Sequence, residues 1–314
     1  MPMICVNVLG LKMFKEELKK YVETSGLVNM KEAGPGIYVL KYKKKVFYDN
    51  LWNDYIAECR GSIVDKDFNL VSYPFTKIYN YGIEKEAPVF SEIDTIVTAY
   101  RKVNGFMVSV SYWNGDVLVS TTGSTSGDFV EYAKEMMLKH MPWADWQMAL
   151  MADGCRDMTF MFECVHPNDP HIVPEKPGMY ILGYREKTWQ SAVGHEPAVL
   201  EQLGEMFHCF VPEYWHLTVR ALKNFVKTVK HEGFVFYDEH GVGAKIKSPY
   251  YLTSKWVARN PRTDKLVDMN KDIKQNLDEE YYPLVDAIRE NIAEYTAMDE
   301  QARLTWVRNF VEGN

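Results

Sequence analysis

A lysine that precedes a tight turn is the first candidate for chemistry in this chain. Lys102 is followed by Val103, Asn104 and Gly105, and the glycine lets the backbone come close to a ligand before the next strand begins. A lysine amine that has lost its proton is a nucleophile and can form a covalent intermediate. The pattern KxxG is short, so a solvated lysine at a surface turn is the alternative for this segment alone.

Two glutamates occur where apolar strands are expected. Glu163 lies in the run Thr159–Val165, and the two-residue period of a strand places it on one face with Met161 and Val165. A buried carboxylate needs a partner, because burying an unpaired charge is costly. The alternative is an edge strand with Glu163 in water. Glu232 precedes Gly233 at the start of a second apolar run.

Cationic and aromatic side chains suited to a nucleotide lie on both sides of these segments. Lys245 and Lys247 point to one face of a strand, and they repel each other unless an anion such as a triphosphate lies between them. Lysines in water on an edge strand are the alternative. Upstream, Arg60 offers a guanidinium fork that matches phosphate, and Tyr79 offers a ring on which a base could stack.

Short strands dominate the elements that must position these residues. From residue 36 to residue 238 the chain alternates β-like runs with turns. The strongest hairpin signal is Phe106–Trp113, then Asn114-Gly115, then Asp116–Ser120, since Asn-Gly readily adopts positive φ angles. Apolar spacing predicts helices near 129–137, capped by Ser126 or Asp128, and near 219–229.

The character of the chain changes after Ser254. A polar stretch at 259–280 is followed by helical spacing at Leu284, Ile288 and Ile292, and then by a last segment at 304–311. We therefore expect one large domain at 1–254 and a small helical domain at 255–314.

Composition limits the classes of function. The 314 residues are 46% hydrophobic, and a net charge of -7 means that any nucleic-acid contact must use a local basic groove. The five scattered cysteines indicate neither a disulfide framework nor a zinc knuckle. No run of about 18 apolar residues occurs that could span a bilayer. We expect a cytoplasmic protein without a membrane partner.

The order of these motifs resembles that of the covalent nucleotidyltransferases, which include ATP-dependent ligases and RNA capping enzymes. The segments RGSIVD, FTKIYNYGIE, KVNGFMVSVSYWNG, FMFECVHPNDPHIV, HEGFVFYD and AKIKSPYY look most like the RNA ligase family typified by the first RNA ligase of bacteriophage T4. The likeness covers about residues 58–254. It implies an α+β fold, in which a nucleotidyltransferase (ATP-grasp-like ligase) domain of antiparallel sheets flanked by helices carries a small helical C-terminal domain.

The resemblance also implies roles for individual residues. Lys102 would attack the α-phosphate of ATP, with Lys245 and Lys247 as further catalytic residues that stabilise charge on the phosphate. Glu163 and Glu232 would hold a divalent metal, Mg²⁺ or alternatively Mn²⁺. The expected nucleotide-binding residues are Arg60, Lys77, Tyr79, Gly105, Glu163, Glu232, Gly233, Lys245 and Lys247.

By the same likeness, the substrates would be ATP and RNA with 5′-phosphate and 3′-hydroxyl ends. The expected setting is RNA repair, for example of tRNA, by a monomer acting in the host cytoplasm if a bacteriophage encodes it. The alternatives are an RNA capping guanylyltransferase or a DNA ligase of the same superfamily, and a non-catalytic RNA-binding protein.

Two positions depart from the pattern of relatives. Many ligases have aspartate where Asn104 stands, which puts a direct electrostatic role for this position in doubt. Close relatives carry a lysine immediately before Gly123, where this chain has Thr122, so one expected phosphate contact is missing.

Overall fold

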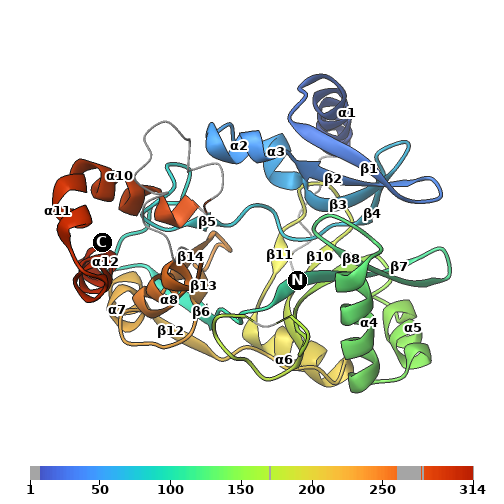
Figure 1. Cartoon of the computed structure of the whole chain (residues 1–314). Helices are drawn as coiled ribbons and strands as arrows, with labels where there is room; N and C mark the ends of the chain where they lie inside the picture. Colours follow the sequence, from blue (N-terminus) through green and yellow to red (C-terminus); the bar gives the residue numbers. More distant parts are fainter. Residues whose placement is uncertain (1–7, 170, 260–276, 278, 314) are drawn as a thin grey trace. The chain divides into compact units, whose positions relative to one another are not determined.

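The computed structural model describes residues 8–169, 171–259, 277 and 279–313, and the chain divides into two compact units. The first unit consists of residues 1–77, 105–169 and 175–212. The second consists of residues 78–104, 170–174 and 213–314. Each unit is built from helices and mainly antiparallel strands (Figure 1), which confirms the predicted α+β class.

A four-stranded antiparallel sheet begins the first unit, in the order β1-β2-β3-β4. Its strands are β1 (Val28–Gly34), β2 (Ile37–Tyr42), β3 (Arg60–Asp65) and β4 (Leu70–Ser72). Three helices accompany this sheet, namely α1 (Val8–Thr24), α2 (Lys44–Tyr48) and α3 (Asp54–Glu58).

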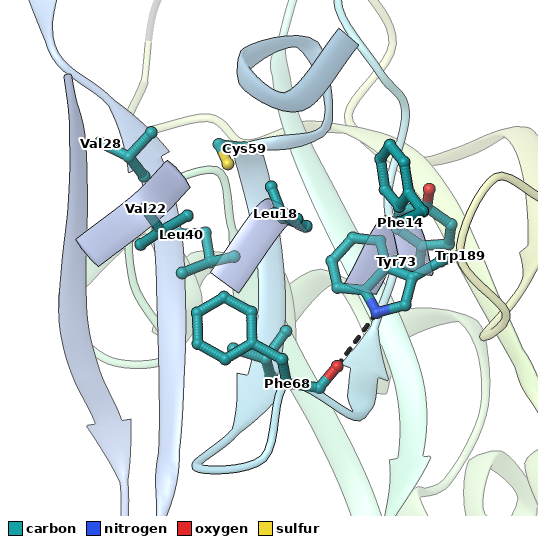
Figure 2. Close-up of a cluster of buried hydrophobic side chains, with 10 residues drawn as sticks. Phe14, Leu18, Val22, Val28, Leu40, Cys59, Phe68, Tyr73 and Trp189 are labelled. Atoms are coloured by element: carbon teal, nitrogen blue, oxygen red, sulfur yellow. Dashed lines mark hydrogen bonds between the residues drawn. The ribbon is translucent and has the colours of Figure 1, made fainter. Parts of the chain in front are cut away.

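Helix α1 closes the core of this sheet. Phe14, Leu18 and Val22 recur every four residues, so they share one face of the helix and are buried together. Figure 2 shows this face against the strands, with the Trp189 indole N–H donating to the Phe68 carbonyl at 3.0 Å. The core fixes β3, the strand that begins with the predicted phosphate ligand Arg60.

A five-stranded antiparallel sheet completes the first unit, in the order β11-β10-β9-β7-β8. Asn114 and Gly115 have φ of 50° and 86°, so the predicted hairpin of β7 and β8 is confirmed. The strands are β7 (Phe106–Trp113), β8 (Asp116–Thr121), β9 (Met158–Val165), β10 (Gly178–Glu186) and β11 (Val193–Gly194). The helices are α4 (Asp128–His140), α5 (Trp143–Met151) and α6 (Pro197–Met206).

Helix α4 confirms one predicted helix but not its cap. The residue before the helix is Gly127, with φ of 98° and no side chain to accept a hydrogen bond. Asp128 lies in the first turn, where a carboxylate interacts favourably with the helix dipole. The prediction that Ser126 or Asp128 caps the helix was therefore wrong.

The second unit contains a five-stranded sheet in the order β12-β6-β13-β14-β5. All its pairs are antiparallel except that of β14 with β5. The strands are β5 (Tyr79–Asn80), β6 (Ile96–Arg101), β12 (Tyr214–Thr218), β13 (Gly233–Tyr237) and β14 (Gly243–Lys247). Helix α7 (Val219–Phe225) packs Val219 and Leu222 onto this sheet, in the region where a helix was predicted.

Helices follow the last strand, as the sequence predicts. They are α8 (Pro249–Arg259), a 3₁₀ turn η2 (Glu279–Tyr281), α10 (Tyr282–Glu290), α11 (Ile292–Ala297) and α12 (Glu300–Gly313). Leu284, Ile288 and Tyr295 form a core of their own with Trp256 and Val307. A boundary at residue 254 stays a prediction, and most of the polar stretch at 259–280 lies outside the described residues.

Two further predictions concern single features of the chain. Cys59, Cys155, Cys164 and Cys209 are free thiols, and Cys5 lies outside the described residues. Among the described residues, no helix is long and apolar enough to cross a membrane.

Candidate functional site

Lys102 lies directly after strand β6 and is fixed to the neighbouring strand β13. Its backbone N–H donates to the carbonyl of Gly233 at 2.8 Å. Its side chain is 23% exposed, and Nζ lies 3.0 Å from Oε2 of Glu232. The structure therefore excludes the alternative that Lys102 is a solvated lysine at a surface turn.

Glu232 is a buried carboxylate that contacts several polar side chains around Lys102. Its Oε2 also accepts a hydrogen bond from Nδ2 of Asn104 at 2.8 Å, and its Oε1 lies 3.9 Å from Nζ of Lys247. Burial raises the pKa of Glu232, but the charges of Lys102 and Lys247 outweigh burial and hold that pKa below its ordinary value. Glu232 is therefore an anion held between two lysines.

Asn104 has a clear role although it lacks the charge common at this position in ligases. Its amide nitrogen donates to Glu232, while its Oδ1 accepts from the backbone N–H of Val173 at 3.2 Å. A carboxylate here could accept from Val173 but could not donate to Glu232. The asparagine thus supports the glutamate by hydrogen bonding.

Gly233 allows the backbone next to Glu232 to lie close against strand β14. Its φ is 135°, and a Cβ atom here would lie 2.1 Å from the carbonyl oxygen of Ile246. Gly233 pairs with Lys247 in the antiparallel ladder, which brings the ends of β13 and β14 together. Only glycine permits this approach of the two backbones.

Lys247 is held by a second glutamate that the sequence analysis missed. Glu280 of η2 accepts a very short hydrogen bond from Lys247 and lies 3.4 Å from Nζ of Lys255 in α8. Burial alone would lower the pKa of Lys247, but Glu280 and Glu232 raise it above its ordinary value. Glu280 lies 33 residues from Lys247 within a polar stretch, so no local pattern pointed to this contact.

The pH dependence of stability should report this network. Burial raises the pKa of Glu280, but Lys247 and Lys255 outweigh it and lower the pKa to about 2, from an ordinary value of 4.5. The stabilisation is therefore full above pH 4.5 and is lost as the pH falls toward about 2. We expect Glu280→Gln to lower the unfolding temperature at neutral pH, with a difference from wild type that shrinks below pH 4.5.

The matched control is Glu239→Gln, which removes an exposed carboxylate that lies beside His240. This variant should unfold close to wild type at every pH, since exposed pairs contribute little. If the difference between Glu280→Gln and wild type stayed constant from pH 6 to about pH 2, the assigned role of Glu280 would be incorrect.

Lys245 and Tyr79 lie on neighbouring strands of the same sheet. Ala244 pairs with Tyr79 and Lys245 with Asn80, so β14 lies between β13 and β5. The alternative of lysines on an edge strand is therefore excluded for Lys245. The charge of Lys245 also helps to lower the pKa of Glu280, although less than those of Lys247 and Lys255.

Within the first unit, Gly105 and Glu163 are joined by a hydrogen bond. The Gly105 N–H donates to Oε1 of Glu163 at 3.1 Å, and Glu163 is only 8% exposed on β9, between β7 and β10. This excludes the alternative of an edge strand with Glu163 in water. A Cβ atom at Gly105 would lie 2.3 Å from the Cys164 carbonyl oxygen, so in this structure the glycine allows strand packing, whereas its approach to a ligand stays a prediction.

We expect Gly105→Ala to lower the free energy of unfolding by about 2 to 4 kcal/mol, since the clash involves backbone atoms that cannot move aside. Urea denaturation measures this. Gly26→Ala is the control, because Gly26 has φ of 67° with open space around it and the change should cost only about 1 to 2 kcal/mol. Equal costs for the two variants would refute the packing role of Gly105.

Arg60 begins β3 beside the same sheet. Its Nη1 lies 3.8 Å from Sδ of Met107, and Met107 pairs with Glu163 across β7 and β9. Glu58, just upstream, forms a buried ion pair with Arg185 at 3.0 Å, which anchors the start of the strand. Arg60 is thus positioned near Glu163 within the first unit.

Lys77 is buried against aromatic rings. It is 8% exposed, and its Nζ lies 4.5 Å from the ring centre of Trp52 and 5.6 Å from that of Phe47. Rings stabilise a cation in this arrangement. Phosphate binding by Lys77 stays a prediction.

The ammonium group of Lys41, on strand β2, lies beside the turn at Thr122. A Cβ atom at Gly123 would lie 2.9 Å from Nζ of Lys41, which belongs to β2. Lys41 pairs with Arg60 across β2 and β3. Thr122 lacks the lysine side chain of relatives, but Lys41 places an ammonium group beside the same turn.

Metal binding by Glu163 and by Glu232 stays a prediction. In the part of the chain that the structure describes, no group of three or more acidic, histidine or cysteine side chains gathers to hold a metal ion. Magnesium is usually held by one or two carboxylates together with water and substrate phosphates. Glu163 and Glu232 supply oxygen donors that suit this pattern.

Comparison with known proteins shows the family of this chain. A model of an RNA ligase family matches residues 58–251. An RNA ligase of Rhodothermus phage RM378 is 24% identical over 302 residues, which covers 74% of this chain and 67% of the phage protein.

Solved structures show the same fold. A putative ATP-dependent DNA ligase from Aquifex aeolicus has a TM-score of 0.57 at 16% identity, covering 95% of this chain and 77% of that chain. Two structures of an archaeal ATP-dependent RNA ligase, form 1 and form 2, have TM-scores of 0.57 and 0.56 at 14% identity, each covering 96% of this chain and 78% of that chain. The fold is the nucleotidyltransferase fold of ATP-dependent ligases, as the motif order implied.

Proposed function

Because this chain belongs to the RNA ligase family typified by the first RNA ligase of bacteriophage T4, we propose that it seals RNA with ATP through an AMP adduct on Lys102. The observation that supports this most strongly is the contact of Lys102 with buried Glu232, which in turn lies beside Lys247. In this proposal Lys102 is the nucleophile, and Lys247 is the cation that binds phosphate.

The first step forms the adduct. Lys102 loses its proton to water, and the free amine, which Glu232 positions at 3.0 Å, attacks the α-phosphorus of ATP. A P–N bond forms, the P–O bond to the leaving group breaks, and pyrophosphate departs. Lys247 and Lys245 stabilise the negative charge that develops on the phosphate oxygens.

Two further steps complete sealing. A 5′-phosphate oxygen of RNA attacks the phosphorus of the AMP, and the P–N bond to Lys102 breaks. The 3′-hydroxyl of a second RNA end then attacks the 5′-phosphorus, which forms the phosphodiester and releases AMP. Arg60, Lys77 and Tyr79 are proposed to bind phosphates and adenine.

Mg²⁺, or alternatively Mn²⁺, is the proposed metal, with Glu163 and Glu232 as its ligands. When bound, a divalent cation would neutralise charge on the phosphates. The proposed setting is RNA repair, and the phage relative fits an enzyme that acts in an infected host cell.

The superfamily alternatives make different predictions for the nucleotide and the substrate. We expect labelling of the protein by ATP and not by GTP, and joining of 5′-phosphorylated RNA in preference to DNA. Labelling by GTP alone would favour a capping guanylyltransferase, and joining of DNA alone would favour a DNA ligase. Binding of RNA with no labelling at all would favour the non-catalytic alternative.

A further inference from the structure

A cavity in the second unit lies next to the proposed adenylylation residues. Its volume is about 600 Å³, which is typical of small-molecule sites. Lys245 and Lys247 line one side, and Lys247 is also the residue that lies 3.9 Å from Glu232. The cavity is therefore linked to the proposed nucleophile through two side chains, Lys247 and Glu232.

The cavity combines cations with an apolar wall. Its charged lining residues are Lys223, Lys227, Lys245 and Lys247, opposed by Glu280. The excess of positive charge contrasts with the net charge of -7 of the whole chain. A cationic site on an acidic protein is local and selects an anion.

Lys227 is the cation best suited to reach a ligand. Lys223 is paired with Glu92 at 2.6 Å, and Lys247 is engaged by Glu280. Lys227 is exposed, and its side chain forms no hydrogen bond or ion pair with other residues in the described portion of the chain. Its ammonium group is available to a phosphate.

The apolar wall comes from the loop after β5 and from the C-terminal helices. It includes Tyr81 and Ile83 of the loop, Leu284 of α10, and Phe310 and Val311 of α12. Aromatic and apolar surfaces beside a cationic groove are the features that bind single-stranded nucleic acid. A nucleotide offers the matching combination of a phosphate, a ribose and a flat base.

We propose that this cavity binds one nucleotide of the RNA substrate, with its phosphate at Lys227 and its base or ribose against the apolar wall. The inference rests on the proposed function for the identity of the ligand. It gives the C-terminal helices a role in holding RNA, because α10 and α12 complete the wall.

The first test compares Lys227→Gln with Lys230→Gln, a neutralisation of an exposed lysine that does not line the cavity. The probe is a 5′-phosphorylated single-stranded RNA oligonucleotide, and the readouts are its Kd at several salt concentrations and the rate of AMP labelling. We expect Lys227→Gln to raise Kd about tenfold. We also expect the slope of log affinity against log salt to shrink by about 0.7, the value for one lost phosphate contact on a single strand.

The second test blocks the cavity without changing its charge. Ile83→Trp adds bulk at a lining residue that is 43% exposed, so the fold should tolerate it. Val89→Trp is the control, at a position that is 95% exposed and outside the lining. We expect Ile83→Trp to weaken RNA binding while its rate of AMP labelling stays at the wild-type value. The Val89→Trp control should match wild type in both RNA binding and AMP labelling.

Either of two outcomes would overturn the inference. If RNA binding were unchanged in Lys227→Gln and Ile83→Trp, the cavity would not hold RNA. If AMP labelling fell as much as RNA binding, the cavity would serve ATP instead. A wild-type protein that bound RNA but never gained AMP would refute the proposed function, while the RNA titrations would still decide the role of the cavity.

Discussion

Lys102→Arg is expected to abolish the AMP adduct while leaving the fold intact. A guanidinium group stays protonated in proteins, so it has no lone pair with which to attack phosphorus. It retains the positive charge that Glu232 contacts at 3.0 Å, and the buried carboxylate therefore keeps a counter-charge. Labelling with radioactive ATP measures the adduct, and circular dichroism during thermal unfolding measures the fold.

Lys102→Ala separates the chemical role from the structural one. It should also form no adduct, but its free energy of unfolding should fall by about 1 to 3 kcal/mol because Glu232 loses a hydrogen-bonding partner. Adduct formation by Lys102→Arg at any rate near wild type would show that another residue is the nucleophile.

Glu232→Gln is expected to slow adduct formation about 100-fold, the cost that misplacement of a reacting group can have. Glutamine removes the anion that lies between Lys102 and Lys247, so their side chains repel each other and the amine of Lys102 loses its position. The single-turnover rate of AMP labelling at saturating ATP measures this effect.

The matched control is Glu213→Gln in the same unit. Glu213 is 69% exposed and lies 3.6 Å from Arg101, the residue next to Lys102. Its loss should leave the rate of labelling within about twofold of wild type, since exposed pairs contribute little. A Glu232→Gln protein that labelled as fast as this control would limit Glu232 to a structural role.

The sequence could predict the parts of the fold that depend on local patterns. Asn114-Gly115 specifies its hairpin because both residues must adopt positive φ, and strands β9, β13 and β14 follow from apolar runs. The predicted cap of α4 was wrong for a local reason too, because Gly127 precedes the helix and has no side chain to accept a hydrogen bond.

The contacts of the candidate site depend on residues far apart in the chain. Lys247 and Lys255 both contact Glu280, which lies 33 and 25 residues from them along the chain, so no spacing rule encodes these contacts. The sequence analysis expected a nucleotide phosphate as the anion beside the paired lysines, and the structure shows that the protein already supplies a carboxylate there. Under the proposed mechanism, substrate phosphate would compete with Glu280 for Lys247.

Asn104 shows how a departure from a family pattern can be understood only from its contacts. As a single letter it suggested a lost charge, but its amide links Glu232 to the backbone of Val173. An aspartate at this position would add a second anion beside the buried glutamate.

The most direct test is to incubate the purified protein with ATP and Mg²⁺, digest it, and locate the modified residue by peptide mass spectrometry. We predict one AMP per chain, attached to Lys102, which disappears when 5′-phosphorylated RNA is added and which pyrophosphate removes. A protein that gains no AMP, or that carries it on a residue other than Lys102, would contradict the proposed mechanism.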